Sequence, residues 1–164
     1  MYQFMKKISV LALLFAVLFS GCSKSGDDDK CTYDECGIKA PDSEIAAVQA
    51  HITSKGIIAE KHCSGVFYTL ENPGTGNNPT PCSNIAIKYK GYLTNGTVFD
   101  QATSPVGFSL SRLINGWRSV LPLVKAGGRV VLYIPPSLGY GSQASGQIPA
   151  NSIIIFEIDL IEVQ

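Results

Sequence analysis

The apolar residues that follow Pro41 repeat with the spacing of an α-helix. Ile45, Val48 and Ile52 fall at i, i+3 and i+7, so they share one face of a helix. The pair Pro41-Asp42 offers an N-cap before this stretch, and Gly56 stands where a C-terminal cap belongs. The pattern predicts a short helix whose narrow apolar stripe packs on the edge of a domain.

From Cys63 onward the apolar residues follow a period of two, which is typical of β-strands. The pattern predicts strands at residues 66–70, 85–93, 129–134 and 152–163. The pair Asn95-Gly96 is a strong hairpin signal, and we expect residues 97–100 to lead back antiparallel to the preceding strand. In the last strand, Phe156 and Ile158 share a face while Glu157 and Asp159 lie on the other, as in an antiparallel sheet with one buried side.

A short helix is predicted near Gly116-Trp117, and Pro122 should end or bend it. One short helix packed against a sheet that has one buried and one solvent-exposed face gives an α+β domain. The length of 164 residues agrees with one such domain.

The first 21 residues have the pattern of a signal peptide. Lys6 and Lys7 precede an apolar stretch at residues 8–19, which is shorter than the roughly 20 residues a membrane-spanning helix needs. The string L-F-S-G-C resembles a bacterial lipobox, in which Cys22 would be diacylated and become the mature N-terminus. Two acyl chains would hold the protein stably on a membrane. We therefore expect an exported protein, lipid-anchored to a bacterial outer membrane on its periplasmic or surface-exposed face; an ordinary secretory signal with a chance cysteine is the alternative.

Residues 22–41 have the composition of a polar tether that ends in a small cysteine loop. Four cysteines follow the lipidation candidate: Cys31, Cys36, Cys63 and Cys82. An even number of thiols in an exported chain predicts two disulfides. Three connectivities are open, and we favour Cys31–Cys36 with Cys63–Cys82. A zinc site that adds His51 or His62 is the alternative, but the spacing is not that of a zinc motif, so we expect no metal.

Charge and motifs exclude several classes of function. The 13 basic and 13 acidic residues balance, and without Lys6 and Lys7 the count is 11 against 13, or −2. This leaves no basic footprint for nucleic acid. The sequence has neither a G-x-S-x-G elbow nor a P-loop lysine, and we expect no cofactor.

Five strings resemble, in order, the motifs of the FKBP-type peptidyl-prolyl cis-trans isomerases: I-K-Y-K-G-Y-L-T-N-G-T-V-F-D, F-S-L-x-x-L-I-N-G-W, L-P-L-V-K-A-G-G, Y-I-P-P-S-L-G-Y-G and I-P-A-N-S-I-I-I-F-E-I-D-L. The resemblance covers about residues 65–163. It implies a twisted antiparallel sheet wrapped around one short α-helix, with the active pocket between them. The expected organisation is a lipoprotein signal peptide at 1–21, a tether and cysteine loop at 22–41, an N-terminal helical extension at 42–62, and an isomerase domain at 63–164.

The resemblance also implies the residues of the pocket. The catalytic set carried over from the family is Tyr89, Phe99, Asp100, Ile114, Trp117 and Tyr140. Further contacts to the substrate would come from Val106, Leu113, Ile148 and Phe156. Trp117 would form the floor, the backbone N–H of Ile114 would donate to a substrate carbonyl, and Asp100 with the Tyr140 hydroxyl would supply polar contacts.

A pocket of this kind has a physical reason to speed rotation about X-Pro bonds. The twisted transition state loses amide resonance and is less dipolar than the planar amide, so a dry aromatic pocket favours it. The expected partners are proline-containing polypeptides. Val106 stands where many members have an aromatic residue, which leaves binding of macrolide inhibitors open. The alternative functions are a non-catalytic proline-binding chaperone or interaction module, and a structural lipoprotein on the same scaffold.

Overall fold

The computed structural model describes residues 31–164; the predicted signal peptide, Cys22 and the first part of the tether lie outside the described residues. Its elements, in chain order, are α1 (Asp42–Ser54), β1 (Glu60–Lys61), β2 (Phe67–Asn72), β3 (Asn84–Leu93), β4 (Val98–Ser109), η1 (Leu110–Arg112), α2 (Asn115–Val120), η2 (Leu121–Leu123), β5 (Gly128–Ile134), η3 (Pro136–Leu138) and β6 (Ile154–Val163). None of the helices between residues 31 and 164 is long and apolar enough to cross a membrane.

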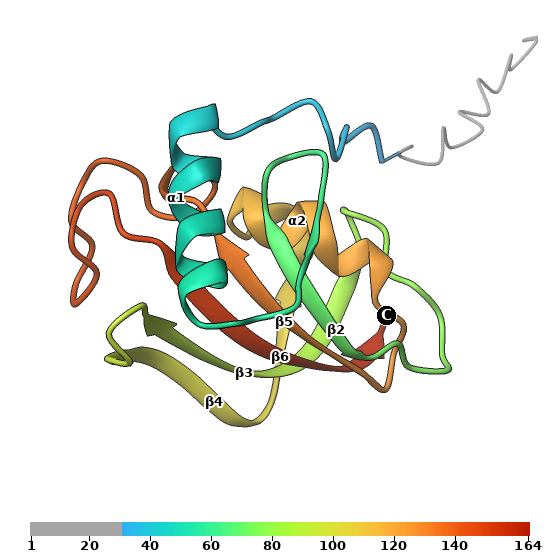
Figure 1. Ribbon diagram of the computed structural model, residues 1–164. Helices are drawn as coiled ribbons and strands as arrows, with labels where there is room; N and C mark the ends of the chain where they lie inside the picture. Colours follow the sequence, from blue (N-terminus) through green and yellow to red (C-terminus); the bar gives the residue numbers. More distant parts are fainter. Residues whose placement is uncertain (1–30) are drawn as a thin grey trace, which may run out of the picture. The chain divides into compact units, whose positions relative to one another are not determined.

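Within residues 31–164 the strands form one six-stranded antiparallel sheet in the order β1-β2-β5-β6-β3-β4. Figure 1 shows β5 and β6 side by side in the middle of this sheet. The predicted α+β class and the four predicted strands are confirmed. The Asn95-Gly96 hairpin is present, with the N–H of Leu93 donating to the Thr97 carbonyl over 2.9 Å. β4 extends to Ser109, well past the expected end at residue 100, and β1 was not expected.

The main core lies between α2 and one face of the sheet. Alternate residues of β5 and β6 point into it, as the period of two predicts; Val130, Leu132, Ile154 and Ile158 have no exposed surface. At roughly 25 cal/mol per Å² of apolar surface, such burial is the main favourable contribution to folding. The core therefore fixes where α2 lies on the sheet.

The opposite face of the sheet is divided into an apolar and a charged half. Val48 and Ile52 of α1 pack there against Phe67, Val131 and Ile155. The prediction that the stripe packs on the domain edge was therefore wrong, since it lies on a face of the sheet. The reason is that odd-numbered residues of β5 and β6 supply a second apolar patch. The other half is an ion cluster in which Arg129 pairs with Glu71 at 2.8 Å, Glu157 at 2.9 Å and Asp159 at 3.0 Å.

The favoured disulfide pairing was wrong. The structure joins Cys31 to Cys82 and Cys36 to Cys63, with Cα–Cα separations of 5.7 and 5.4 Å. The segment before α1 does not close on itself. It runs along the domain, where the N–H of Ala40 donates to the Ser64 carbonyl over 2.9 Å and brings Cys36 to the turn after β1. Two non-local links therefore tie the N-terminal segment to the domain.

Breaking the longer link tests this pairing. The double variant Cys31→Ser/Cys82→Ser should lower the free energy of unfolding by about 2–4 kcal/mol, because the disulfide restricts the unfolded chain across a sequence separation of 51 residues. Urea denaturation of variant and parent measures the change. Mass mapping of the linked peptides under non-reducing conditions is the control, and a Cys31–Cys36 peptide would contradict the structure.

Candidate functional site

An apolar hollow of about 120 Å³ lies between the short helix α2 and the strands β3 and β4. Its lining consists of aromatic and aliphatic side chains with one acid: Tyr89, Asp100, Phe108, Leu113, Ile114, Trp117, Tyr140 and Phe156. Drug-sized ligands occupy pockets of roughly 300–1,000 Å³, so this hollow suits a single small side chain or ring.

The walls of the hollow are aromatic rings that meet edge to face. The ring centroids of Trp117 and Phe156 are 4.8 Å apart at an interplanar angle of 88°, and those of Tyr89 and Trp117 are 5.6 Å apart at 75°. Phe99 packs behind Phe156 at 5.4 Å and 90°. Each such contact is favourable because the positive edge of one ring meets the negative face of the next. The rings therefore hold one another in place around the hollow.

The floor of the hollow depends on a close approach of α2 to β5. Gly116 begins the buried side of α2, and a Cβ there would lie 2.6 Å from Cγ2 of Ile134. Glycine thus lets the helix settle deeply enough to bury Trp117, which is 4% exposed. Ile114 precedes the helix with φ −58° and ψ 150°, and within residues 31–164 its N–H has no acceptor. A free N–H is therefore available at the edge of the floor.

A glycine on β3 makes room for the side walls. A Cβ on Gly91 would lie 2.5 Å from Phe156 and 2.7 Å from Phe99, closer than real contacts allow. Gly91 pairs with Asp100 on β4 and with Phe156 on β6, at the center of this part of the sheet. The missing side chain leaves room for both rings, of which Phe156 lines this hollow and Phe99 the adjacent one.

The polar side of the hollow is a phenol–carboxylate pair. The hydroxyl of Tyr89 donates to Oδ2 of Asp100 over 2.7 Å. Burial of Tyr89, followed by this hydrogen bond and the charge of Asp100, raises the pKa of Tyr89 to about 12. Burial, with the Asp100 charge second, also raises the pKa of Tyr140. Both phenols thus stay neutral at physiological pH and can serve as donors.

The sequence-predicted residues meet here with three exceptions, Phe99, Ile148 and Val106. Of the catalytic set, Tyr89, Asp100, Ile114, Trp117 and Tyr140 line the hollow, as do Leu113 and Phe156 from the second set. Phe99 and Ile148 line an adjacent hollow that shares Asp100 and Tyr140 with the first. Val106 lines neither, because it pairs with Ile87 further along β4 and packs on the core.

Phe108 is a lining residue that the sequence reasoning missed. Its ring centroid lies 6.2 Å from that of Tyr89 at an angle of 62°. The available signal was its place in the F-S-L string, in the apolar register of β4.

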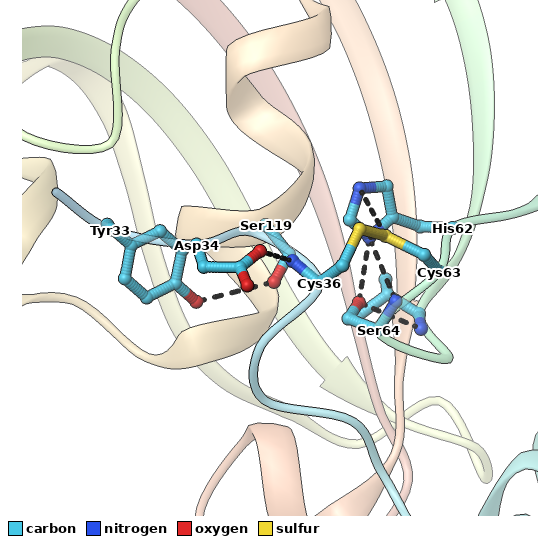
Figure 2. The surroundings of a disulfide bond; sticks show 8 residues. Tyr33, Asp34, Cys36, His62, Cys63, Ser64 and Ser119 are labelled. Carbon is cyan, nitrogen blue, oxygen red and sulfur yellow. Dashed lines mark hydrogen bonds between the residues drawn. A yellow bond between two sulfur atoms is a disulfide. The ribbon is translucent and has the colours of Figure 1, made fainter.

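The N-terminal segment supports α2 from behind. The Arg118 guanidinium lies 3.8 Å from the center of the Tyr33 ring, and the Tyr33 hydroxyl is 3.5 Å from that of Ser119. Figure 2 shows Tyr33 facing Ser119, near the Cys36–Cys63 disulfide. A cation over a ring contributes roughly 0.5–2 kcal/mol. The segment held by the disulfides thus contacts the helix that carries the floor of the hollow.

The cysteines and histidines do not form an open metal site in the described part of the chain. Cys36, His62 and Cys63 are close together, but the two sulfurs are bonded to each other (Figure 2). Nδ1 of His62 accepts the N–H of Ser64 over 3.2 Å, and the Ser64 hydroxyl lies 2.9 Å from it. These groups therefore anchor the turn after β1.

Comparison with known sequences gives a consistent result. Residues 76–161 match the family described as FKBP-type peptidyl-prolyl cis-trans isomerase. The FKBP-type isomerase FkpA of Buchnera aphidicola from Schizaphis graminum is 41% identical over 114 residues, which cover 67% of this chain and 44% of the relative. FkpA of Escherichia coli K12 is 35% identical over 104 residues, or 62% of this chain and 38% of the relative. The chain thus spans about half the length of the curated relatives it matches.

Solved structures share the fold. A peptidyl-prolyl cis-trans isomerase from Pseudomonas syringae superimposes with a TM-score of 0.67 at 31% identity, covering 78% of this chain and 99% of the other. FkpA of Escherichia coli gives a TM-score of 0.66 at 30% identity, covering 75% of this chain and 58% of the other.

The phenol–carboxylate pair predicts a measurable titration. Asp100→Asn should lower the pKa of Tyr89 from about 12, because the negative charge beside the phenol is lost. The pKa should remain above the ordinary value of 10, since burial is the larger cause. In the parent, the raised pKa stabilises the fold fully below about pH 10, and this contribution is lost as the pH rises through 12.

An NMR titration of the tyrosine rings measures this shift. Glu60→Gln is the matched control, since Glu60 accepts the Tyr68 hydroxyl over 2.9 Å on β1, away from the hollow. It should change the pKa of Tyr68 and leave that of Tyr89 alone. An unchanged Tyr89 pKa in Asp100→Asn would contradict the pairing.

Proposed function

The chain belongs to the FKBP-type peptidyl-prolyl cis-trans isomerase family, and from this we propose that it catalyses rotation about X-Pro bonds in exported polypeptides and so assists their folding. The observation that carries the proposal is the small hollow walled by Tyr89, Trp117 and Phe156, with Asp100 at its side. Such a site suits a prolyl ring, which is apolar, compact and flanked by two carbonyl groups.

The reaction needs differential binding and no bond to be made or broken. Resonance in the X-Pro amide opposes rotation by roughly 18–20 kcal/mol, and uncatalysed exchange takes tens to hundreds of seconds. The half-rotated amide has lost this resonance and much of its dipole. A hollow with little water and many ring carbons therefore binds it more tightly than the planar amide, and each ~1.4 kcal/mol of difference is worth about tenfold in rate.

The proposed roles follow from position. Trp117 supports the prolyl ring from below, and Tyr89, Phe99 and Phe156 form or brace the apolar sides. The N–H of Ile114 donates to a carbonyl of the bound peptide and holds it while the amide turns. The neutral Tyr140 hydroxyl supplies a second donor. With Asp100 and Leu113 at the rim and Ile148 in the adjacent hollow, the peptide contacts both hollows. A macrolide inhibitor of this family would compete for the same hollow.

Isomerase activity on a short peptide tests the proposal. A fragment starting after Cys22 should accelerate cis-trans exchange of an Ala-Leu-Pro-Phe peptide, measured by a coupled assay or exchange NMR. Phe99→Ala and Asp100→Ala should each lower kcat/KM by roughly tenfold or more, because a side wall or the partner of Tyr89 is lost.

Glu60→Ala serves as the control, because it breaks a similar phenol–carboxylate pair far from the hollow. It should leave kcat/KM unchanged. A parent fragment that binds the peptide without accelerating exchange would favour a proline-binding chaperone instead. A fragment that neither binds the peptide nor accelerates its exchange would favour the third alternative, a structural lipoprotein.

For location, we propose that residues 1–21 are a lipoprotein signal peptide and that Cys22 is diacylated, which anchors the domain to the outer membrane. The string L-F-S-G-C, which resembles a lipobox, supports this proposal. The polar residues between Cys22 and Cys31 would serve as the tether, because the chain from Cys31 onward is bonded to the domain.

Metabolic labelling with a fatty acid in a Gram-negative host checks the anchor. The full chain should carry label and fractionate with membranes, whereas Cys22→Ser should carry none. Cys82→Ser is a control that keeps Cys22, so it should remain labelled. Labelling that persists in Cys22→Ser would rule out this lipidation site.

A further inference from the structure

One hydrogen-bonded contact links the N-terminal helix to the turn that presents Tyr140. Oε2 of Glu44, in the first turn of α1, accepts the backbone N–H of Ser137 over 2.9 Å and its hydroxyl over 2.7 Å. The two residues are 93 positions apart in sequence. A hydrogen bond to an ionised carboxylate is roughly twice as strong as one between neutral groups. The contact therefore joins α1 directly to the turn at Ser137, two elements far apart in the sequence.

The turn that Glu44 holds is short and closely bonded. η3 runs from Pro136 to Leu138, and the carbonyl of Pro136 accepts the N–H groups of Gly139 at 3.0 Å and Gly141 at 2.8 Å. Leu138, 1% exposed, anchors the inner side of the turn in the core. Glu44 anchors the outer side. Tyr140 lies between the two bonded glycines, so the turn fixes the backbone position from which the Tyr140 side chain extends.

Tyr140 depends on this turn more than the other rings do. Its side chain is 38% exposed, whereas Trp117 and Phe156 are 4% and 3% exposed. Among the aromatic rings of residues 31–164, its ring meets that of Phe99 edge to face, with the centroids 6.2 Å apart. Packing alone thus fixes the floor and the side walls, but Tyr140 is held mainly through its backbone. A shift of the turn would move the Tyr140 hydroxyl relative to Asp100 and the hollow.

The helix that carries Glu44 is itself a fixed support. Val48 is fully buried and Ile52 is 3% exposed against the sheet face that β2, β5 and β6 provide. Glu44 lies one turn before Val48, so its carboxylate is placed by a packed helix. The outer anchor of the turn therefore has little freedom of its own.

From these contacts we infer that Glu44 is a positioning residue for the isomerase reaction: through Ser137 it holds the Pro136–Gly141 turn so that Tyr140 faces the hollow. This inference rests on the proposed function. It gives the N-terminal extension a part in catalysis, because α1 supplies one of the two anchors of a pocket wall.

The test compares Glu44 with a neighbouring acid on the same helix turn. Glu44→Ala should lower kcat/KM for the Ala-Leu-Pro-Phe peptide about fivefold, since the outer anchor is lost. Glu44→Gln should restore most of the rate, because the amide oxygen still accepts both donors. Asp42→Ala is the matched control: Asp42 pairs with Lys39 at 3.1 Å and does not touch the turn, so the rate should stay unchanged.

A second variant and a readout other than activity separate positioning from stability. Ser137→Ala should lower the rate less than Glu44→Ala, and the double variant should lose less than the product of the two losses, since both changes break one contact. Amide NMR signals of Leu138, Gly139 and Gly141 should move in Glu44→Ala and not in Asp42→Ala. Thermal melting of each variant shows how much of any loss is unfolding.

The outcomes are distinct. If the parent is active and Glu44→Ala retains its full rate, the positioning inference is overturned. If Glu44→Gln is as slow as Glu44→Ala, the accepting oxygen is not what matters and the inference is likewise overturned. If the parent itself lacks activity while the amide signals move as expected, the proposed function fails and the link between Glu44 and the turn stands.

Discussion

The contact between Trp117 and Phe156 is the interaction on which the rest of the site depends. Their ring centroids are 4.8 Å apart, and each ring belongs to an element on a different side of the main core. The contact requires α2 to sit close to the sheet, which Gly116 permits, and it requires an empty position on β3, which Gly91 provides. Two missing side chains thus decide the shape of the hollow as much as the rings do.

The sheet carries out separate tasks on its two faces. One face supports α2 and the hollow, while the other receives α1 and holds the Arg129 ion cluster. The period of two along β5 and β6 makes this division possible, because successive residues point to opposite faces. The N-terminal helix α1 is therefore packed on a face of the sheet rather than attached at its edge.

The N-terminal segment approaches the site from two directions. Tyr33 stacks on Arg118 of the helix that bears Trp117, and Glu44 binds the turn that bears Tyr140. The disulfides Cys31–Cys82 and Cys36–Cys63 tie the segment to the domain on either side of Tyr33. For the proposed reaction, which depends on the shape and low polarity of the hollow and needs no reactive group, accurate placement of the walls is the main contribution the protein can make.

The sequence by itself determined most of the elements, though not β1 or the end of β4, and the identity of most pocket residues. Period-two runs placed the strands, the i, i+3, i+7 stripe placed α1, and the family motifs named Tyr89, Asp100, Ile114, Trp117 and Tyr140, which the structure brings to one hollow. These features are local or carried by short motifs, so they can be read from neighbouring residues.

Tertiary structure alone decided what joins distant parts of the chain. The disulfide partners, the second apolar face that receives α1 and the Glu44–Ser137 contact all link residues far apart in sequence. Val106 and Phe108 share the apolar register of β4, yet Phe108 alone lines the hollow. Spacing along a chain reports which face a side chain points to, but not which other element arrives there, because that depends on how the whole core packs.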